Sequence, residues 1–125
     1  MKNIKLICFI TILIYSFSYS QQKEQLGCTK HLAISAKMNF EESLKTNSLI
    51  IYLRGGIVSA ITNEDKKFEK LYGIKYHDFG CVLPENLTYY ESYNHFVFNY
   101  LKEKFGNDWK KSINKNAFGV NNLTL

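Results

Sequence analysis

Arg54, Gly55 and Gly56 form the first group of residues whose types could do chemistry. Glycines at such a point let backbone N–H groups approach an anion, and the guanidinium of Arg54 could pair with that anion. The segment matches neither G-x-G-x-x-G nor G-x-x-x-x-G-K-[ST], the patterns typical of nucleotide-binding loops. It therefore predicts either a small anion-binding site or a plain tight turn with a surface arginine.

His77, Asp78 and Cys81 form the second group, and they supply the residue types of a base, an orienting carboxylate and a thiol nucleophile. Adjacent side chains on a strand point to opposite faces, so His77 and Asp78 are poorly placed to form a relay. The spacing favours a half-exposed strand histidine and a bridged cysteine over a thiol-dependent enzyme. We expect no catalytic residue here.

No metal or cofactor site is expected. The histidines at positions 31, 77 and 95 are far apart, so no two of them have the three- or four-residue spacing of a metal-binding pair on a helix. The aromatic residues between 89 and 105 recur at helical spacing, which indicates a packed core rather than base stacking. The formal charge of +5 falls to +3 without Lys2 and Lys5, too little to indicate a nucleic-acid-binding protein.

Residues 1–20 have the layout of a secretory signal peptide. Two lysines precede an uncharged apolar run from Leu6 to Phe17, and Ser18 and Ser20 offer small residues before a cut at Gln21. Export to the periplasm or the extracellular space follows, with an uncleaved anchor as the alternative. No later segment is expected to span a membrane, and cleavage would leave 105 of the 125 residues.

Cys28 and Cys81 remain after cleavage and are predicted to form a disulfide, since the exported protein meets an oxidising environment. The alternative is a free or reactive thiol at Cys81. Their separation of 53 residues would give such a bridge a stabilisation of about 4 kcal/mol in the chain-entropy model.

Hydrophobic periodicity predicts one small globular domain over residues 28–119, between a flexible arm at 21–27 and a loose tail at 120–125. Its first elements are a helix from Thr29 to Asn47 and a strand at 49–53. A helix from Thr62 to Gly73 follows, with Phe68, Leu71 and Tyr72 on its apolar face, and then a strand at 74–79. The last elements are a long amphipathic helix, which starts with a Thr88–Glu91 capping box and ends at Gly106, and a shorter helix that is capped by Asp108 and carries Trp109. Residues 57–61 are either a third strand or a packed loop.

This order predicts an α/β fold, in which a right-handed βαβ unit of two or three strands is covered by helices. An α+β fold with a short hairpin is the alternative. If the strands are parallel, their carboxyl ends share one edge of the sheet, where ligands of open α/β sheets collect. Arg54, Gly55, Gly56, His77 and Asp78 are thus the candidate ligand-binding residues.

The segments 52–57, 67–70, 76–81 and 93–106, with Trp109, resemble a set of small exported proteins of flavobacteria-like bacteria. The resemblance implies export from a Gram-negative cell and implies no activity or catalytic residue. The expected function is a non-enzymatic binding or envelope-associated module with a protein partner in the cell envelope. The alternative is a small ligand-binding or thiol-dependent enzyme domain that uses Arg54, Asp78 and Cys81.

Overall fold

The computed structural model describes residues 27–123. The chain divides into two compact units, Met1–His31 and Leu32–Leu125, and the fold that carries the candidate site belongs to the second. The predicted signal peptide at 1–20 and nearly all of the predicted arm at 21–27 lie outside the described residues. A continuous helix, here called the N-terminal helix, covers residues 27–45, and Asn47 follows it with a positive φ of 52°.

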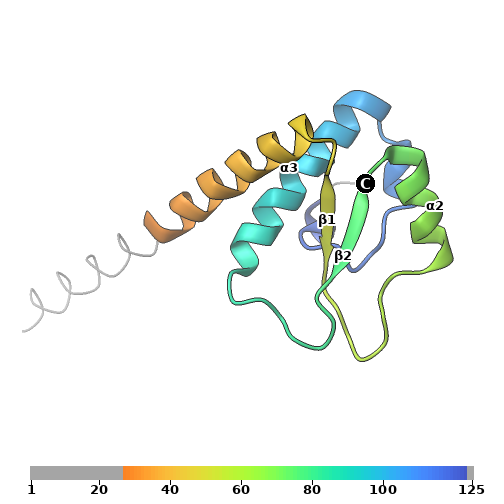
Figure 1. Cartoon of the computed structure of the whole chain (residues 1–125), viewed down its shortest axis with the longest axis horizontal. Coiled ribbons are helices and arrows are strands. Elements are labelled where there is room, and N and C mark those ends of the chain that lie inside the picture. The colour runs from red at the N-terminus through yellow and green to blue at the C-terminus, as the bar shows by residue number, and fades with distance from the viewer. Residues whose placement is uncertain (1–26, 124–125) are drawn as a thin grey trace, which may run out of the picture. The chain divides into compact units, whose positions relative to one another are not determined.

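The sheet consists of two parallel strands, β1 (Ile50–Leu53) and β2 (Lys75–Asp78), in which Ile50 pairs with Lys75 and Leu53 with Asp78. The helix α2 (Asn63–Tyr72) connects them, so the predicted βαβ unit and the α/β class are confirmed (Figure 1). Ile51 and Leu53 are fully buried, whereas Ile50 and Tyr52 on the other face are half-buried.

The ends of α2 follow the predicted local chemistry. Thr62 and Asp65 form a complete capping box, and Gly73 ends the helix in the left-handed conformation at φ 69°. The predicted apolar face is wrong in one member, because Leu71 is 70% exposed. Phe68 lies at the centre of the buried face, and its ring is 4.5 Å from that of Tyr72 and 5.4 Å from that of Tyr76.

The long helix α3 (Leu87–Phe105) begins at Leu87, with Asn86 at the N-cap and no side-chain hydrogen bond there. The predicted capping box of Thr88 and Glu91 is therefore wrong. The buried residues of the helix are Tyr93, Asn94, Val97, Phe98 and Leu101.

Residues 32–45 of the N-terminal helix pack against α3 (Figure 1). The ring of Phe40 lies 5.8 Å from that of Phe96 and 6.3 Å from that of Tyr93, and the Asn39 amide donates to the Tyr89 hydroxyl at 2.6 Å. Of the apolar residues that recur at helical spacing in this helix, Ala36 is fully buried, whereas Leu44 is 40% exposed.

The other edge of β1 is covered by the chain after α3. Leu53 and Ala117 form an antiparallel bridge, with the Arg54 N–H donating to the Asn116 carbonyl at 2.8 Å and the Phe118 N–H donating to the Tyr52 carbonyl at 3.1 Å. Residues 57–61, expected as either a third strand or a packed loop, form a loop, in which Ile57 and Val58 are exposed.

Asn94 completes this edge from α3. It is fully buried and accepts from the Tyr52 N–H at 2.9 Å, while its amide donates to the carbonyls of Tyr52 at 2.8 Å and Phe118 at 3.0 Å. The amide side chain thereby takes hydrogen bonds that a neighbouring strand would otherwise make, and it attaches α3 to the sheet.

Two short 3-10 helices follow α3: Asp108–Lys111 and Val120–Asn122. Asp108 is the first residue of its helix and not the predicted cap. Residues 120–123 are not a loose tail, because Val120 and Leu123 pack against the core.

Candidate functional site at the carboxyl ends of the strands

The loops that leave β1 and β2 lie at one edge of the sheet, as the parallel order predicts. Gly55 approaches the backbone of Gly80 and the carboxylate of Asp78 so closely that a Cβ atom at position 55 would collide with both. Gly55 is therefore required for the contact between the loops. The Cys81 thiol adds a weak bond at 3.5 Å to the Gly56 carbonyl.

Asp78 joins the two loops through its carboxylate. One oxygen accepts from the Gly80 N–H at 2.8 Å and the other from the Ala60 N–H at 2.7 Å. These two backbone hydrogen bonds hold the pKa of Asp78 below its ordinary value, with smaller contributions from the Ser59 hydroxyl and the charge of His77. Asp78 is thus an ionised clamp and a weak base rather than a proton acceptor for catalysis.

We expect Asp78→Asn to lower the free energy of unfolding at pH 7 and to remove part of its dependence on pH below about 5. Because the folded-state pKa is lowered, the stabilisation by Asp78 is present above the unfolded-state pKa of about 3.9 and is lost as the pH falls through the folded-state value. Urea titrations at pH 7 and pH 3 measure both effects. Equal losses of stability at the two pH values would contradict this role.

The ion pair that the structure gives Arg54 is with Glu91 and not with Asp78. Its guanidinium lies 3.4 Å from a Glu91 carboxylate oxygen and 5.4 Å from the centre of the Phe118 ring. Half of the Arg54 side chain is exposed, so the ion pair is worth about 0–1 kcal/mol. The anion site of Arg54 with Gly55 and Gly56 stays a prediction, and in the structure the arginine has a carboxylate partner.

His77 and Asp78 face opposite sides of β2, as predicted. The exposed imidazole lies 5.7 Å from the Tyr52 ring and 4.7 Å from the Phe79 ring. Asp78 is instead directed to the two loops. The structure thus brings His77 into an aromatic group and leaves it outside any relay with Asp78.

Cys28 and Cys81 are free and exposed in the structure. Cys28 belongs to the unit Met1–His31 and Cys81 to the second unit, so the disulfide stays a prediction. Thiol titration of the exported protein tests it: the bridge requires no reactive thiol before reduction and two afterwards. Two reactive thiols before reduction would contradict the bridge.

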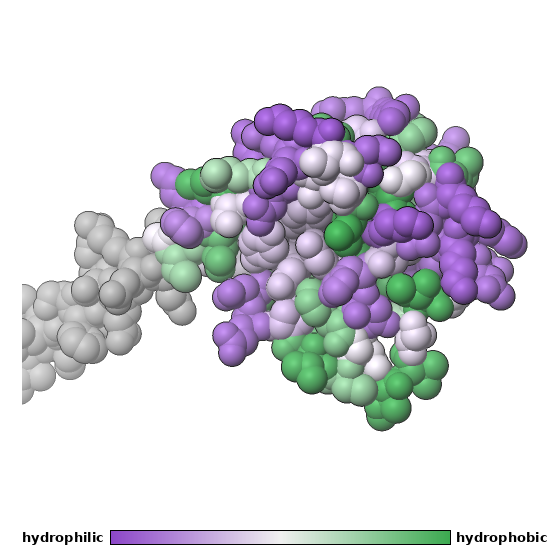
Figure 2. Space-filling model, viewed as in Figure 1, coloured by the Kyte–Doolittle hydropathy of each residue, from purple (hydrophilic) through white to green (hydrophobic). Residues whose placement is uncertain are grey.

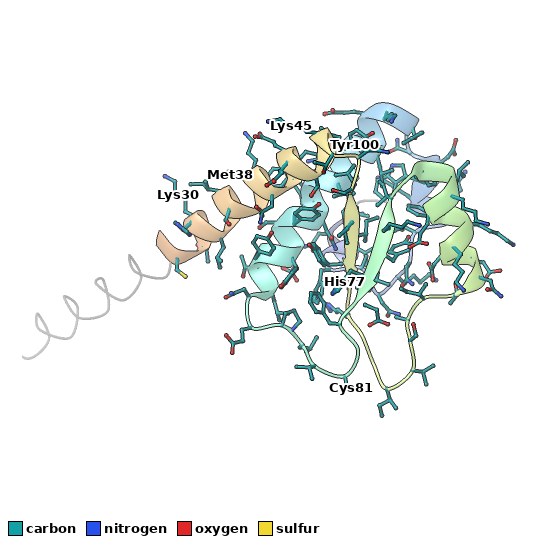
Figure 3. All side chains as sticks on the ribbon, in the orientation of Figure 1. Lys30, Met38, Lys45, His77, Cys81 and Tyr100 are labelled. Atoms are coloured by element: carbon teal, nitrogen blue, oxygen red, sulfur yellow. The ribbon has the colours of Figure 1, made fainter. Side chains whose placement is uncertain are left out.

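The same loops carry an exposed aliphatic surface that the sequence did not reveal. Ile57 is 96%, Val58 80%, Val82 76% and Leu83 57% exposed. We call these four residues the apolar tip. Figure 2 shows hydrophobic colour gathered over both loops, and Figure 3 places Cys81 in the second of them. The apolar run at 57–61 is the one sequence signal of this surface, and it predicts a third strand or a packed loop rather than exposed side chains.

Within residues 27–123, no three side chains among His, Cys, Asp and Glu gather as a metal site would require. In the same range no helix combines the length and the apolar character needed to cross a membrane. No protein-family model, curated protein or solved structure matches this chain. Its function must therefore be argued from its own surfaces.

Proposed function

We propose that this protein is a non-enzymatic, envelope-associated module that attaches to a lipid surface through the apolar tip. The observation that carries the proposal is the exposure of four aliphatic side chains on two loops that are fastened to each other. Burying one Val, Leu or Ile side chain contributes about 1.5–3 kcal/mol. Four together approach the attachment given by a single acyl chain, which is reversible, with a constant on the order of 10⁴ M⁻¹.

The absence of charge on the two loops supports a lipid surface as the partner. Residues 55–63 and 79–84 contain no Asp, Glu, Lys or Arg, while Arg54, Glu64, Asp78 and Glu85 stand at their outer ends. Charged side chains resist entry into the apolar part of a bilayer, whereas aliphatic side chains favour it. The distribution therefore suits shallow insertion of the loops with the charged residues left in water.

The fastening of the loops supports ready insertion. Asp78 bonds to both Ala60 and Gly80, and Gly55 fits against Gly80. Because the loops are already held together, attachment orders little additional backbone, and less of the apolar gain is lost as conformational entropy.

The roles of the candidate catalytic residues support a non-enzymatic module. The Asp78 carboxylate is occupied by two backbone N–H groups and its pKa is lowered, which weakens it as a base. His77 faces the opposite side of the strand. Export of the chain to the envelope is supported by the signal-peptide pattern and by the resemblance to small exported proteins.

Sedimentation with vesicles of zwitterionic phosphatidylcholine tests the proposal. The processed protein is compared with an Ile57→Ser/Val58→Ser variant and with Leu71→Ser, a control whose leucine is 70% exposed on α2. We expect the wild type and Leu71→Ser to co-sediment with the vesicles and the tip variant to bind at least tenfold more weakly. Melting curves establish that all three proteins are folded.

Two results would overturn the proposal. The first is equal vesicle binding by the wild type and the tip variant. The second is no vesicle binding together with a dimer in sedimentation velocity that the tip substitutions dissociate, because the apolar tip would then serve a second copy of the chain.

A further inference from the structure

The half-buried face of the sheet opens into a cleft lined by aromatic rings. Tyr52 of β1 and His77 of β2 are partners in the strand register, Phe79 follows on the same face, and Tyr89 and Tyr90 come from the first turn of α3. The cleft has a volume of about 600 Å³. Figure 3 places His77 on the sheet, away from the loop of Cys81 and thus from the apolar tip.

The rings hold one another in place. Tyr90 meets Tyr52, Phe79 and Tyr89 edge to face at centroid distances of 4.8, 4.8 and 5.0 Å, and Tyr52 stacks on Phe79 at 5.8 Å. The Tyr89 hydroxyl is further fixed by the Asn39 amide. Side chains that are already ordered lose little freedom when a ligand binds, so this surface is preorganised.

Among the described residues, the lining contains no Asp, Glu, Lys or Arg. Its polar groups are the hydroxyls of Ser35 and the tyrosines, the Asn86 amide and the His77 imidazole. Burial, with the neighbouring tyrosines, raises the pKa of Tyr52 to about 12, so its hydroxyl stays protonated. The cleft thus offers aromatic surfaces together with neutral donors and acceptors.

We infer that this cleft binds a neutral carbohydrate, with a pyranose ring against the aromatic side chains and its hydroxyls bonded to the neutral polar groups around them. A sugar ring has an apolar C–H surface and a rim of hydroxyls, which matches both parts of the lining. The inference concerns a different surface from the apolar tip, so either proposal can fail while the other holds.

Two other ligands that prefer aromatic surfaces fit less well. A nucleotide would stack on the rings, but its phosphate requires cationic side chains, and residues 27–123 place no Lys or Arg in the lining. A quaternary ammonium would gain from the ring faces, yet none of the lining residues that the structure describes is a carboxylate that could balance its charge. The neutrality of the lining therefore favours the uncharged sugar.

Isothermal titration calorimetry with maltohexaose, cellohexaose and chitohexaose tests the inference. We expect saturable binding of at least one hexasaccharide, with a Kd of about 1 mM or tighter. His77→Ala and Tyr90→Ala should each weaken that binding at least tenfold. His95→Ala is the matched control, because His95 is an exposed histidine of α3 that does not line this cleft, and it should bind as the wild type does.

The inference is overturned if no hexasaccharide binds, or if His77→Ala binds as tightly as His95→Ala. Because the imidazole is exposed, His77→Ala keeps the fold, so the comparison does not depend on the stability of Tyr90→Ala. Titrations with tetramethylammonium and adenosine monophosphate complete the test. Saturable binding of either one that His77→Ala weakens, without binding of the sugars, would assign the cleft to another ligand class.

Discussion

Replacement of Asn94 by leucine is expected to lower the free energy of unfolding by about 2–6 kcal/mol. Leucine has a similar volume but no polar atoms, so the Tyr52 N–H and the Phe118 carbonyl lose their bonds to this side chain inside the core. A buried backbone group without a partner costs about 1–3 kcal/mol. The Tyr52 carbonyl keeps the bond from the Phe118 N–H and adds less.

Asn99→Leu is the control for this prediction, because Asn99 is an exposed asparagine on the same helix. Its effect should stay within about 0.5 kcal/mol, as is usual for surface substitutions. Urea unfolding of the two variants gives the comparison. If Asn94→Leu unfolded at the same urea concentration as Asn99→Leu, the side-chain amide would not be what holds α3 to the edge of β1.

The hydrogen bonds of Asn94 to the strand could not be predicted from the sequence. Its position is three, four and seven residues before Val97, Phe98 and Leu101, so helical spacing places it on the buried face. The aromatic residues define the stripe, however, and nothing local indicates that an asparagine within it bonds to a strand 42 residues away. The one signal in the sequence is that Asn94 is a polar residue within an apolar stripe.

Patterns that act within a few residues were predictive at both ends of α2 but not at the start of α3. The capping box of Thr62 and Asp65 formed, and Gly73 ended the helix. The similar pattern of Thr88 and Glu91 did not form, because the N-cap of α3 is Asn86, two residues earlier, and Glu91 pairs with Arg54. Tertiary pairing of a charged residue thus replaced a local role.

The parallel order of the strands predicts the edge of the sheet at which the candidate site lies. It does not predict which groups contact the charged residues of that site. Arg54 meets Glu91 of α3, and Asp78 meets backbone N–H groups of both loops. Both contacts depend on how far each loop turns after its strand. Ala117, rather than residues 57–61, bridges to β1, and Ile57 and Val58 of the apolar run are exposed.

Replacement of Trp109 by alanine is expected to lower the free energy of unfolding by about 3–5 kcal/mol, as for other large-to-small core substitutions. Trp109 is fully buried in the 3-10 helix after α3, and its ring stacks on Phe98 at 5.5 Å. Its Nε1–H donates to the Gly106 carbonyl at 2.9 Å. The ring contact joins this 3-10 helix to α3, and alanine would leave a cavity beneath α3.

Trp109→Phe separates the two contributions. Phenylalanine keeps an aromatic ring against Phe98 but loses the bond to Gly106, so we expect its loss of stability to be at most about half that of Trp109→Ala. Thermal and urea unfolding followed by circular dichroism suit both variants, since neither retains tryptophan fluorescence. An unchanged melting temperature for Trp109→Ala would mean that the segment after Gly106 adds nothing to the core. If Trp109→Phe lost as much stability as Trp109→Ala, the stabilisation would come from the hydrogen bond of Trp109 to Gly106 rather than from the stacked rings.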